Sequence, residues 1–312
     1  MTEGDISRLL VGYRGTAHSW ECDEMGHLNV SFYFGRASDQ AFFLRNAIGL
    51  TPHMMRGEKR GTVALQEHAR FHREVRAGGL MVGRAGVLEV GDRTMDVYYE
   101  FRDADDTLLT TFHTIIGFFD TEARKLVAWP DEVRAKAETL HTALPDAAAP
   151  ARLPAADSET RKLRTLTQDD AQKSGFVHTG GAGINSWECD QFGHMNTMFY
   201  IRRQGEAVPH LQHAMGWDRQ AVISAGIGFA VGEMRINYFN ELHEGDLVAT
   251  WSAVRQLNPK NMIAEHRIFN AETGALSSAA LVCAVCFDLK TRRATEFPPD
   301  MAASAVKHVV PF

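Results

Sequence analysis

Apolar residues recur with a helical period near the start of the chain. Five of them follow one another at spacings of 3, 4, 3 and 4 residues, namely Phe34, Ala37, Ala41, Leu44 and Ile48. This spacing places them on one face of an α-helix. Asn29 can cap the first turn of that helix, and Gly49 can end it. Because Phe42, Phe43 and other aromatic residues occupy the remaining faces, the pattern predicts a helix that is buried on nearly all sides.

Each half of the chain also contains three segments rich in β-branched and aromatic residues. They span 80–90, 94–102 and 107–119 in the first half, and 247–257, 261–269 and 275–287 in the second. Turn-forming residues separate them (GDR and DADD, then NPK and NAETG), as in an antiparallel meander. A short extended stretch, 16–22, leads into the first helix. Since a sheet needs its apolar face covered, we predict an α+β fold with one long helix against each sheet.

The chain contains an internal duplication. Residues 19–29 read SWECDEMGHLN and residues 186–196 read SWECDQFGHMN, and eight of these eleven positions are identical. The offset is 167 residues, and it becomes 168 toward the end of each copy, which indicates a one-residue insertion. The stretch between the copies is rich in Ala, Pro and charged residues, as in an exposed connector. We therefore predict a first domain at 1–135, a linker at 136–171 and a second domain at 172–312.

Composition narrows the class of protein. The 312 residues are 45% hydrophobic and 23% charged, a balance typical of a globular protein. The net charge of −6 argues against nucleic-acid binding, which favours a strongly basic domain. The first ten residues, MTEGDISRLL, lack the pattern of a signal peptide, and the apolar run 281–287 is too short to span a membrane. Four cysteines suggest reduced thiols, so we predict a cytoplasmic protein with no nucleic-acid or membrane partner.

A motif, Asp-x-x-Gly-His-x-Asn, stands directly before each predicted helix. Its residues are Asp23, Gly26, His27 and Asn29 in the first copy and Asp190, Gly193, His194 and Asn196 in the second. A carboxylate can act as nucleophile or general base in hydrolysis, and a helix N-terminus offers amides to an oxyanion. The glycine permits a positive φ or a close backbone approach, the histidine can orient a carboxylate or a water, and the asparagine can cap the helix. The same residue types also build a tight turn before a capped helix, and this structural explanation stays open.

The motif, opening a helix ahead of a long-stranded meander, resembles the hydroxybenzoyl-CoA thioesterase branch of the hotdog superfamily. The resemblance covers both copies and implies two tandem hotdog domains, each an antiparallel sheet wrapped around a long central helix. It also implies an acyl-CoA substrate and a catalytic aspartate, a role that falls on Asp23 and Asp190, as nucleophile or as general base on water. The sequence departs from the commonest family pattern after the final Asn, where a second Asn is frequent, because Val30 and Thr197 stand here.

Two further pairs of residues are candidates for the site. Asp39 and Glu206 occupy equivalent helix positions, and in another hotdog branch the catalytic carboxylate lies on the central helix, so they are the alternative catalytic residues. An ion pair or a solvated helix face is the commoner explanation of such residues. Arg70 and Arg73 belong to a cationic segment, 67–79, that the second copy largely lacks, and we predict that they bind the phosphates of CoA. A solvated strand edge is the alternative.

The cysteines are predicted to be packing residues. Cys283 and Cys286 form a C-x-x-C within an apolar strand, where residues three apart face opposite sides, unlike a zinc or redox pair. Cys22 and Cys189 directly precede the two aspartates, and as neighbours in extended chain they should face away from them.

Together these patterns predict an acyl-CoA thioesterase that hydrolyses an acyl thioester to a free acid and CoA, with no metal or organic cofactor. The alternatives are a non-catalytic acyl-thioester-binding protein of the same fold and a hotdog hydratase or dehydratase, whose Asp-x-Asn-Pro-x-His pattern is absent here. We expect the copies to pair as an intramolecular pseudo-dimer with the sites where the halves meet, and further homo-oligomers stay open. Pro209 interrupts only the second helix, which predicts that the copies are unequal.

Overall fold

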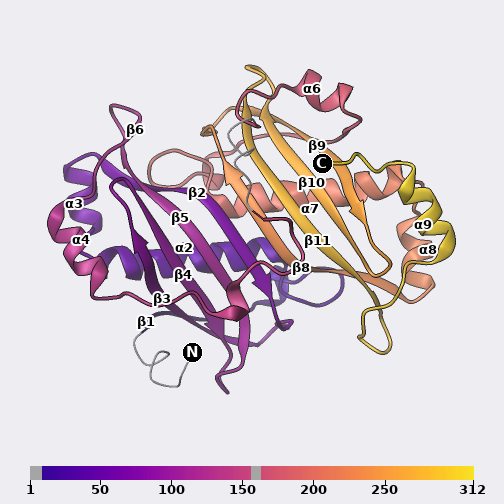
Figure 1. Ribbon diagram of the computed structural model, residues 1–312, viewed down its shortest axis with the longest axis horizontal. Coiled ribbons are helices and arrows are strands. Elements are labelled where there is room, and N and C mark those ends of the chain that lie inside the picture. The colour runs from indigo at the N-terminus through magenta and orange to yellow at the C-terminus, as the bar shows by residue number, and fades with distance from the viewer. Residues whose placement is uncertain (1–8, 156–162) are drawn as a thin grey trace. The chain divides into compact units, whose positions relative to one another are not determined.

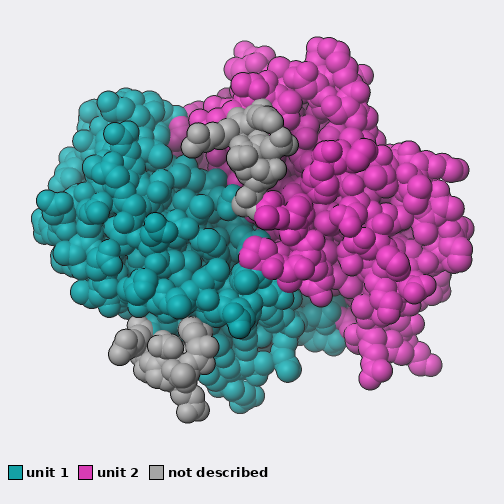
Figure 2. Space-filling model, in the orientation of Figure 1, with its two compact units in different colours: residues 1–149 teal, residues 150–312 magenta. Residues whose placement is uncertain are grey.

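The structure is a computed structural model that describes residues 9–155 and 163–312. The chain divides into two compact units, Met1–Ala149 and Pro150–Phe312, which are described separately (Figure 2). Two predictions fall on residues outside the described ranges. These are the absence of a signal peptide and part of the linker. None of the described helices combines the length and the apolar character that a membrane-spanning helix needs.

Unit 1 is an antiparallel sheet with a long helix, α2, packed on its strands β1 and β3 (Figure 1). The strand order is β1-β3-β4-β5-β2, and the short β6 pairs with β5. The strands are β1 (Leu10–Thr16), β2 (Arg60–Phe71), β3 (Leu80–Val90), β4 (Thr94–Arg102), β5 (Leu108–Asp120) and β6 (Lys125–Leu126). The helices are α2 (Val30–Ala47), α3 (Pro52–Gly57) and α4 (Asp131–Glu138), with 3-10 turns η1 (Ser19–Glu21) and η2 (Asp146–Ala148).

Unit 2 repeats this plan with the strand order β7-β9-β10-β11-β8. The strands are β7 (Val177–Gly183), β8 (Ile227–Tyr238), β9 (Leu247–Leu257), β10 (Asn261–Asn270) and β11 (Leu276–Asp288). The helices are α6 (Gln168–Lys173), α7 (Thr197–Ala214), α8 (Arg219–Ser224) and α9 (Pro299–Val306), with the 3-10 turn η3 (Ser186–Glu188). The long helix α7 packs against β7, β9 and β10.

The long helices and the meanders lie where the sequence predicts them. Strands β3 to β5 and β9 to β11 match the six predicted segments to within one residue at each end. Both predicted helix caps are present: the side chain of Asn29 accepts the N–H of Ser31 at 3.0 Å, and that of Asn196 accepts the N–H of Met198 at 3.1 Å. The predicted α+β fold, with an antiparallel sheet and a long helix in each copy, is confirmed.

Three details of the sequence-based expectation are wrong. The stretch 16–22 is not a strand, because β1 ends at Thr16 where this stretch begins and the 3-10 turn η1 occupies Ser19–Glu21. The sequence pattern also fails to predict the long strands β2 and β8, since buried polar residues such as Glu67 and His68 interrupt the apolar alternation of β2. Finally, α2 is not buried on all sides, because Phe42 and Phe43 are 41% and 49% exposed.

Pro209 lies inside α7, which nevertheless continues from Thr197 to Ala214. Proline lacks the N–H that would bond to the carbonyl of Gly205 four residues earlier. Gly205 is exposed and has open space beside its Cα, so water can reach that carbonyl. Pro209 led us to expect that the two copies differ, but it does not break the second long helix.

Aromatic contacts hold α2 on the sheet of unit 1. The ring of Phe34 lies 5.1 Å from that of Phe112, which lies 6.1 Å from that of Phe101, and each pair is edge to face. All three side chains are fully buried. Burial of one such ring stabilises a fold by roughly 1.5–3 kcal/mol, and an aromatic pair adds about 0.5–1.5 kcal/mol. The helix that follows the motif is therefore fixed firmly to the sheet.

Unit 2 contains a buried series of hydrogen-bonded polar side chains that unit 1 lacks at the equivalent positions. The hydroxyl of Ser252 lies 2.7 Å from Nδ1 of His266 and 2.6 Å from the hydroxyl of Thr179, and all three residues are buried. At the offset of 167, unit 1 has Ala85 and Tyr99 in place of the serine and the histidine. Burial lowers the pKa of His266 to about 4. The imidazole in this core is therefore neutral at physiological pH.

We predict that unit 2 loses stability as the pH falls from 6.5 to about 4. The unfolded chain binds a proton at the ordinary histidine pKa of 6.5, whereas the folded protein resists protonation until about 4, so acid favours unfolding. The loss amounts to roughly 3 kcal/mol at the acid end. Denaturation midpoints across this range should fall less steeply in His266→Tyr, which carries the residue found in unit 1. Equal pH dependence in both proteins would contradict the assignment.

Candidate active site

Asp23 closes a tight turn that precedes α2. Its carbonyl accepts the N–H of Gly26 at 3.0 Å, and its N–H donates to the carbonyl of His27 at 2.8 Å. Its Oδ1 accepts the N–H groups of Met25 at 2.9 Å and of His27 at 3.2 Å. Gly26 has a φ of +76°, which a residue with a side chain adopts only with strain. One carboxylate oxygen is thus fixed, while Oδ2 accepts no hydrogen bond from residues 9–155 or 163–312.

Asp190 repeats this geometry in unit 2. Its Oδ1 accepts the N–H groups of Phe192 at 2.8 Å and of His194 at 3.2 Å. Gly193 has a φ of +77°, and its N–H reaches the carbonyl of Asp190 at 3.0 Å. Asp190 is exposed, whereas Asp23 is half-buried. The motif does build a tight turn, and in both copies that turn leaves Oδ2 without a donor in the described part of the chain.

The first amides of α2 are mostly engaged. The side chain of Asn29 takes the N–H of Ser31, and its carbonyl takes the N–H of Phe32 at 3.0 Å. The N–H of Val30, the first residue of the helix, makes no hydrogen bond within the described ranges. This amide lies at the positive end of the helix dipole, where it can donate to a negatively charged group.

A glutamate holds the motif histidine in each unit. Nε2 of His27 lies 3.2 Å from Oε2 of Glu74. Nδ1 of His194 lies 3.4 Å from Oε1 of Glu241, which is 167 residues after Glu74. Both histidines are buried. The glutamates stand outside the motif, so only their common offset marks them in the sequence, and each places a carboxylate at ion-pair distance from the imidazole.

A buried ion pair joins the motif to α2. Nη2 of Arg36 lies 2.5 Å from Oε2 of Glu21, and the two side chains are 8% and 5% exposed. The same carboxylate accepts the N–H of His18 at 2.8 Å. The carbonyl of Glu21 accepts the N–H of Asn29 at 2.9 Å. Glu21 therefore closes the loop that carries the Asp turn and ties it to the helix.

Glu188 and Arg203 form the same pair in unit 2. Nη2 of Arg203 lies 2.6 and 2.8 Å from the two carboxylate oxygens. Glu188 also accepts the N–H of Asn185 at 2.9 Å, and its carbonyl accepts the N–H of Asn196 at 2.9 Å. Both glutamates belong to the eight positions that are identical in the repeated stretches 19–29 and 186–196. Their role does not follow from the sequence alone, because their arginine partners lie on the next element.

The alternative carboxylates, Asp39 and Glu206, have different surroundings. Burial raises the pKa of Asp39 above its ordinary value, and the nearby Arg36 opposes this shift. Glu206 is exposed, and its two carboxylate oxygens lie 3.1 Å from Nη1 of Arg203 and 3.1 Å from Nε of Arg202. Glu206 therefore forms ion pairs, as the alternative explanation of this residue expects.

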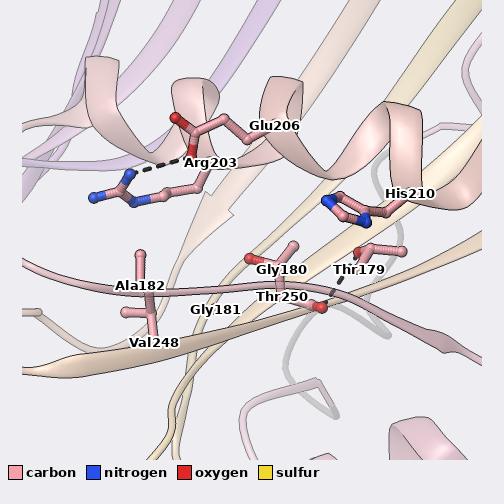
Figure 3. Close-up of a pocket in the computed structure, with 9 residues that line it drawn as sticks. All are labelled: Thr179, Gly180, Gly181, Ala182, Arg203, Glu206, His210, Val248 and Thr250. Carbon is pink, nitrogen blue, oxygen red and sulfur yellow. Dashed lines mark hydrogen bonds and ion pairs between the residues drawn. The ribbon is translucent and has the colours of Figure 1, made fainter.

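A pocket of about 170 Å³ lies between α7 and the strands β7 and β9 (Figure 3). It is lined by Thr179, Gly180, Gly181, Ala182, Arg203, Glu206, His210, Val248 and Thr250. In unit 1, Tyr13 stands in place of Gly180, and Phe43 stands in place of His210. A Cβ added to the neighbouring Gly12 would come within 2.6 Å of Phe43, so this space is already filled. The two copies thus differ in the room that they leave beside the central helix.

The arginines predicted to bind CoA phosphates differ in their contacts. Nη1 of Arg70 donates to the carbonyls of Asp146 at 3.3 Å and of Ala149 at 3.0 Å, which holds the end of unit 1 in place. Arg73 is exposed, as is Arg76 three residues later. Arg73 is therefore the member of the predicted pair that is presented to solvent.

Comparison with known families identifies the chain. A family model described as the thioesterase-like superfamily matches residues 17–137 and 184–304, one segment in each copy. Each segment includes the Asp turn, the long helix and the meander. The chain belongs to the thioesterase-like superfamily. It is a thioester hydrolase built from two tandem hotdog domains, as the resemblance implies.

Individual proteins are similar to this thioesterase-like chain in sequence or in structure. It is 29% identical over 118 residues to the long-chain acyl-CoA thioesterase FadM of Escherichia coli strain K12, a match that covers 36% of this chain and 83% of that protein. A structure from Lactobacillus plantarum, assigned as an oleoyl thioesterase, has a TM-score of 0.67 at 15% identity and covers 89% of this chain and 96% of its own. The 12:0-ACP thioesterase of Umbellularia californica has a TM-score of 0.64 at 13% identity, with coverages of 92% and 98%. At these identities the two structures show a shared fold.

The cysteines of this thioesterase-like chain are placed as packing residues. Cys283 and Cys286 are fully buried in different clusters of the core, and burial raises the pKa of each thiol to about 11. Such thiols are scarcely ionised at neutral pH, so they do not serve as nucleophiles. Cys22 and Cys189 are half-buried, and Sγ of Cys22 donates to the carbonyl of His18 at 3.4 Å.

We predict that Glu21→Gln and Glu188→Gln each destabilise their own unit by about 3 kcal/mol, because each leaves a buried guanidinium without its counter-charge. Thioesterase activity should fall with stability, since the loop of the Asp turn loses its anchor. Urea denaturation followed by tryptophan fluorescence measures the effect. The control, Glu122→Gln, breaks the exposed pair with Lys59 and should leave the midpoint unchanged. Losses no larger than in this control would refute the anchoring role.

Proposed function

We propose that this chain hydrolyses acyl-CoA thioesters with Asp23 and Asp190 as the catalytic carboxylates. The observation that carries the proposal is the geometry of the two turns, in which backbone N–H groups hold one carboxylate oxygen and leave the other open. Membership of the thioesterase-like superfamily supports the reaction class. The similarity to FadM, named as a long-chain acyl-CoA thioesterase, supports the substrate class.

In the proposed reaction, Oδ2 of the aspartate attacks the thioester carbonyl or takes a proton from the attacking water. The C–S bond breaks, CoA leaves as a thiolate that takes up a proton, and one water is consumed. The two N–H groups on Oδ1 hold the carboxylate in one orientation, which lowers the entropic cost of reaching the transition state. In unit 1 the N–H of Val30 provides a donor for the oxyanion.

The loops beside the two turns carry opposite charge. Residues 76–79 read RAGG in unit 1, and residues 243–246 read HEGD in unit 2. Unit 2 therefore lacks the guanidinium of Arg76 and adds the carboxylates of Glu244 and Asp246. Because CoA carries several phosphates, the loop of unit 1 attracts it and the loop of unit 2 repels it. This supports unit 1 as the stronger site for acyl-CoA.

We predict that Asp23→Asn combined with Asp190→Asn lowers steady-state CoA release more than about 100-fold, because an amide can act neither as nucleophile nor as base. The turns should persist, since the amide oxygen still accepts the same N–H groups. The assay is thiol release from acyl-CoA substrates of different chain length, with acyl-ACP in parallel. The matched control is Asp39→Asn with Glu206→Gln. Near-normal release by the first double variant, with loss in the control, would transfer catalysis to the helix carboxylates.

Label that enters the aspartate during a single turnover in isotopically labelled water identifies the aspartate as the nucleophile. If the aspartate is the nucleophile, water that opens the mixed anhydride at the aspartyl carbonyl leaves its label in the enzyme. If it is a general base, the label enters only the product acid. Mass spectrometry of the peptide that contains Asp23 reads the difference.

We predict that Arg73→Ala combined with Arg76→Ala raises KM for acyl-CoA about 10-fold at low salt, with kcat little changed. Charge-assisted contacts to phosphate are worth roughly 1–3 kcal/mol and are alike in ground and transition states. The salt dependence of KM should also weaken. A pantetheine thioester without the nucleotide is the control, and its KM should not change. An unaltered KM for acyl-CoA would show that the two arginines only face solvent in this loop.

Arg70→Ala should lower stability instead, because it removes the hydrogen bonds that Arg70 donates to the carbonyls of Asp146 and Ala149.

A further inference from the structure

Three residues of unit 2 that are able to ligate a metal converge beside the motif. His194 lies in the turn before α7, while Glu241 and His243 lie in the loop after β8, and one ligand atom from each lies within 4.8 Å of the others. Nδ1 of His194 is 3.4 Å from Oε1 of Glu241. In a tetrahedral zinc site, bonds of about 2.0–2.2 Å separate neighbouring ligand atoms by about 3.3–3.5 Å. The first two ligands already have this spacing, and the ligand atom of His243 lies within 4.8 Å of both.

The backbone holds the two histidines together. His194 and His243 are partners in an isolated antiparallel bridge, and their rings lie 5.1 Å apart. Nδ1 of His243 lies 3.2 Å from the carbonyl oxygen of Gly193. Since a carbonyl oxygen only accepts, the neutral form of the ring that makes this contact has its proton on Nδ1 and its lone pair on Nε2. Zinc-bound histidines commonly donate their other ring N–H to a carbonyl in this way, so His243 has the tautomer that a metal requires.

Local charge favours a cation in unit 2 and disfavours one in unit 1. The N–H of His243 donates to the carboxylate of Asp246 at 2.8 Å, which places a further negative charge beside the cluster. Unit 1 retains the pair of His27 and Glu74, but Arg76 replaces the second histidine. A guanidinium supplies no lone pair and repels a dication. The duplication thus provides a natural comparison in which one ligand has been exchanged for a positive charge.

We propose that His194, Glu241 and His243 bind one zinc ion per chain, in unit 2 and not in unit 1. Two imidazoles and one carboxylate are a ligand set that zinc takes in proteins, with the fourth position held by water or another small ligand. The ion is not part of the hydrolysis proposed above, which uses a carboxylate and water. Its binding fixes His194, whose backbone N–H donates to the carboxylate of Asp190. Zinc would therefore act on the turn of one copy only.

Titration calorimetry with zinc chloride near neutral pH, on full-length protein without a polyhistidine tag, tests this proposal. The wild-type chain should bind one equivalent. His243→Arg, which copies unit 1, should weaken binding more than about 100-fold, and Glu241→Gln at least about 10-fold. Glu74→Gln, the matched change in unit 1, should leave zinc affinity unchanged. Cobalt(II) should give the visible absorption of a four-coordinate ion in the wild type and lose it in His243→Arg.

The proposal is overturned if micromolar zinc does not bind, or if His243→Arg keeps the affinity and stoichiometry of the wild type. A loss in Glu74→Gln as large as that in Glu241→Gln also overturns it, because the ion would then depend on unit 1. Circular dichroism establishes that each variant is folded. If His243→Arg does not fold, His243→Gln replaces it with the same expected loss.

Discussion

A buried carboxylate–guanidinium pair is the interaction on which each half of this protein depends. Glu21 with Arg36, and Glu188 with Arg203, join the 3-10 turn before the motif to the central helix after it. The carbonyl of each glutamate also receives the N–H of the residue that caps the helix, as Glu21 does from Asn29. A buried charge left alone costs several kcal/mol, so the pair is satisfied in one arrangement of loop and helix. The Asp turn lies between these anchors, which fix where it begins and where the helix after it starts.

The duplication has kept this scaffold and changed what surrounds it. In both copies the turn fixes one carboxylate oxygen of the aspartate and leaves the other open. Around that constant part, unit 1 carries exposed arginines and fills the space beside its helix with Tyr13 and Phe43. Unit 2 carries acidic residues, a second histidine and a pocket at the equivalent place. In the proposed function the catalytic carboxylates and the residues that discriminate between ligands are thus different, which would permit one copy to specialise without loss of the fold.

Local patterns predict most of the secondary structure here, and the repeat predicts the organisation. Helix caps and meander strands depend on near neighbours, so they are readable from spacing alone. The strands β2 and β8 are not, because buried charged residues such as Glu67 and Arg235 resemble solvated positions. Partners distant in sequence, such as Glu74 for His27, also escape a motif-based prediction. Arg70 bonds to backbone carbonyls and not to solvent. A run of cationic residues in a sequence therefore does not reveal which of them is available to a ligand.

The proposed reaction requires the open carboxylate oxygen of the Asp turn to meet the thioester. A crystal structure with a non-hydrolysable acyl-CoA analogue, in which a methylene group replaces the thioester sulfur, tests it most directly. We expect the ketone carbon within about 3.5 Å of Oδ2 of Asp23, or one bridging water between them. A ketone placed beside Asp39 or Glu206, with both Asp turns away from the ligand, would contradict it.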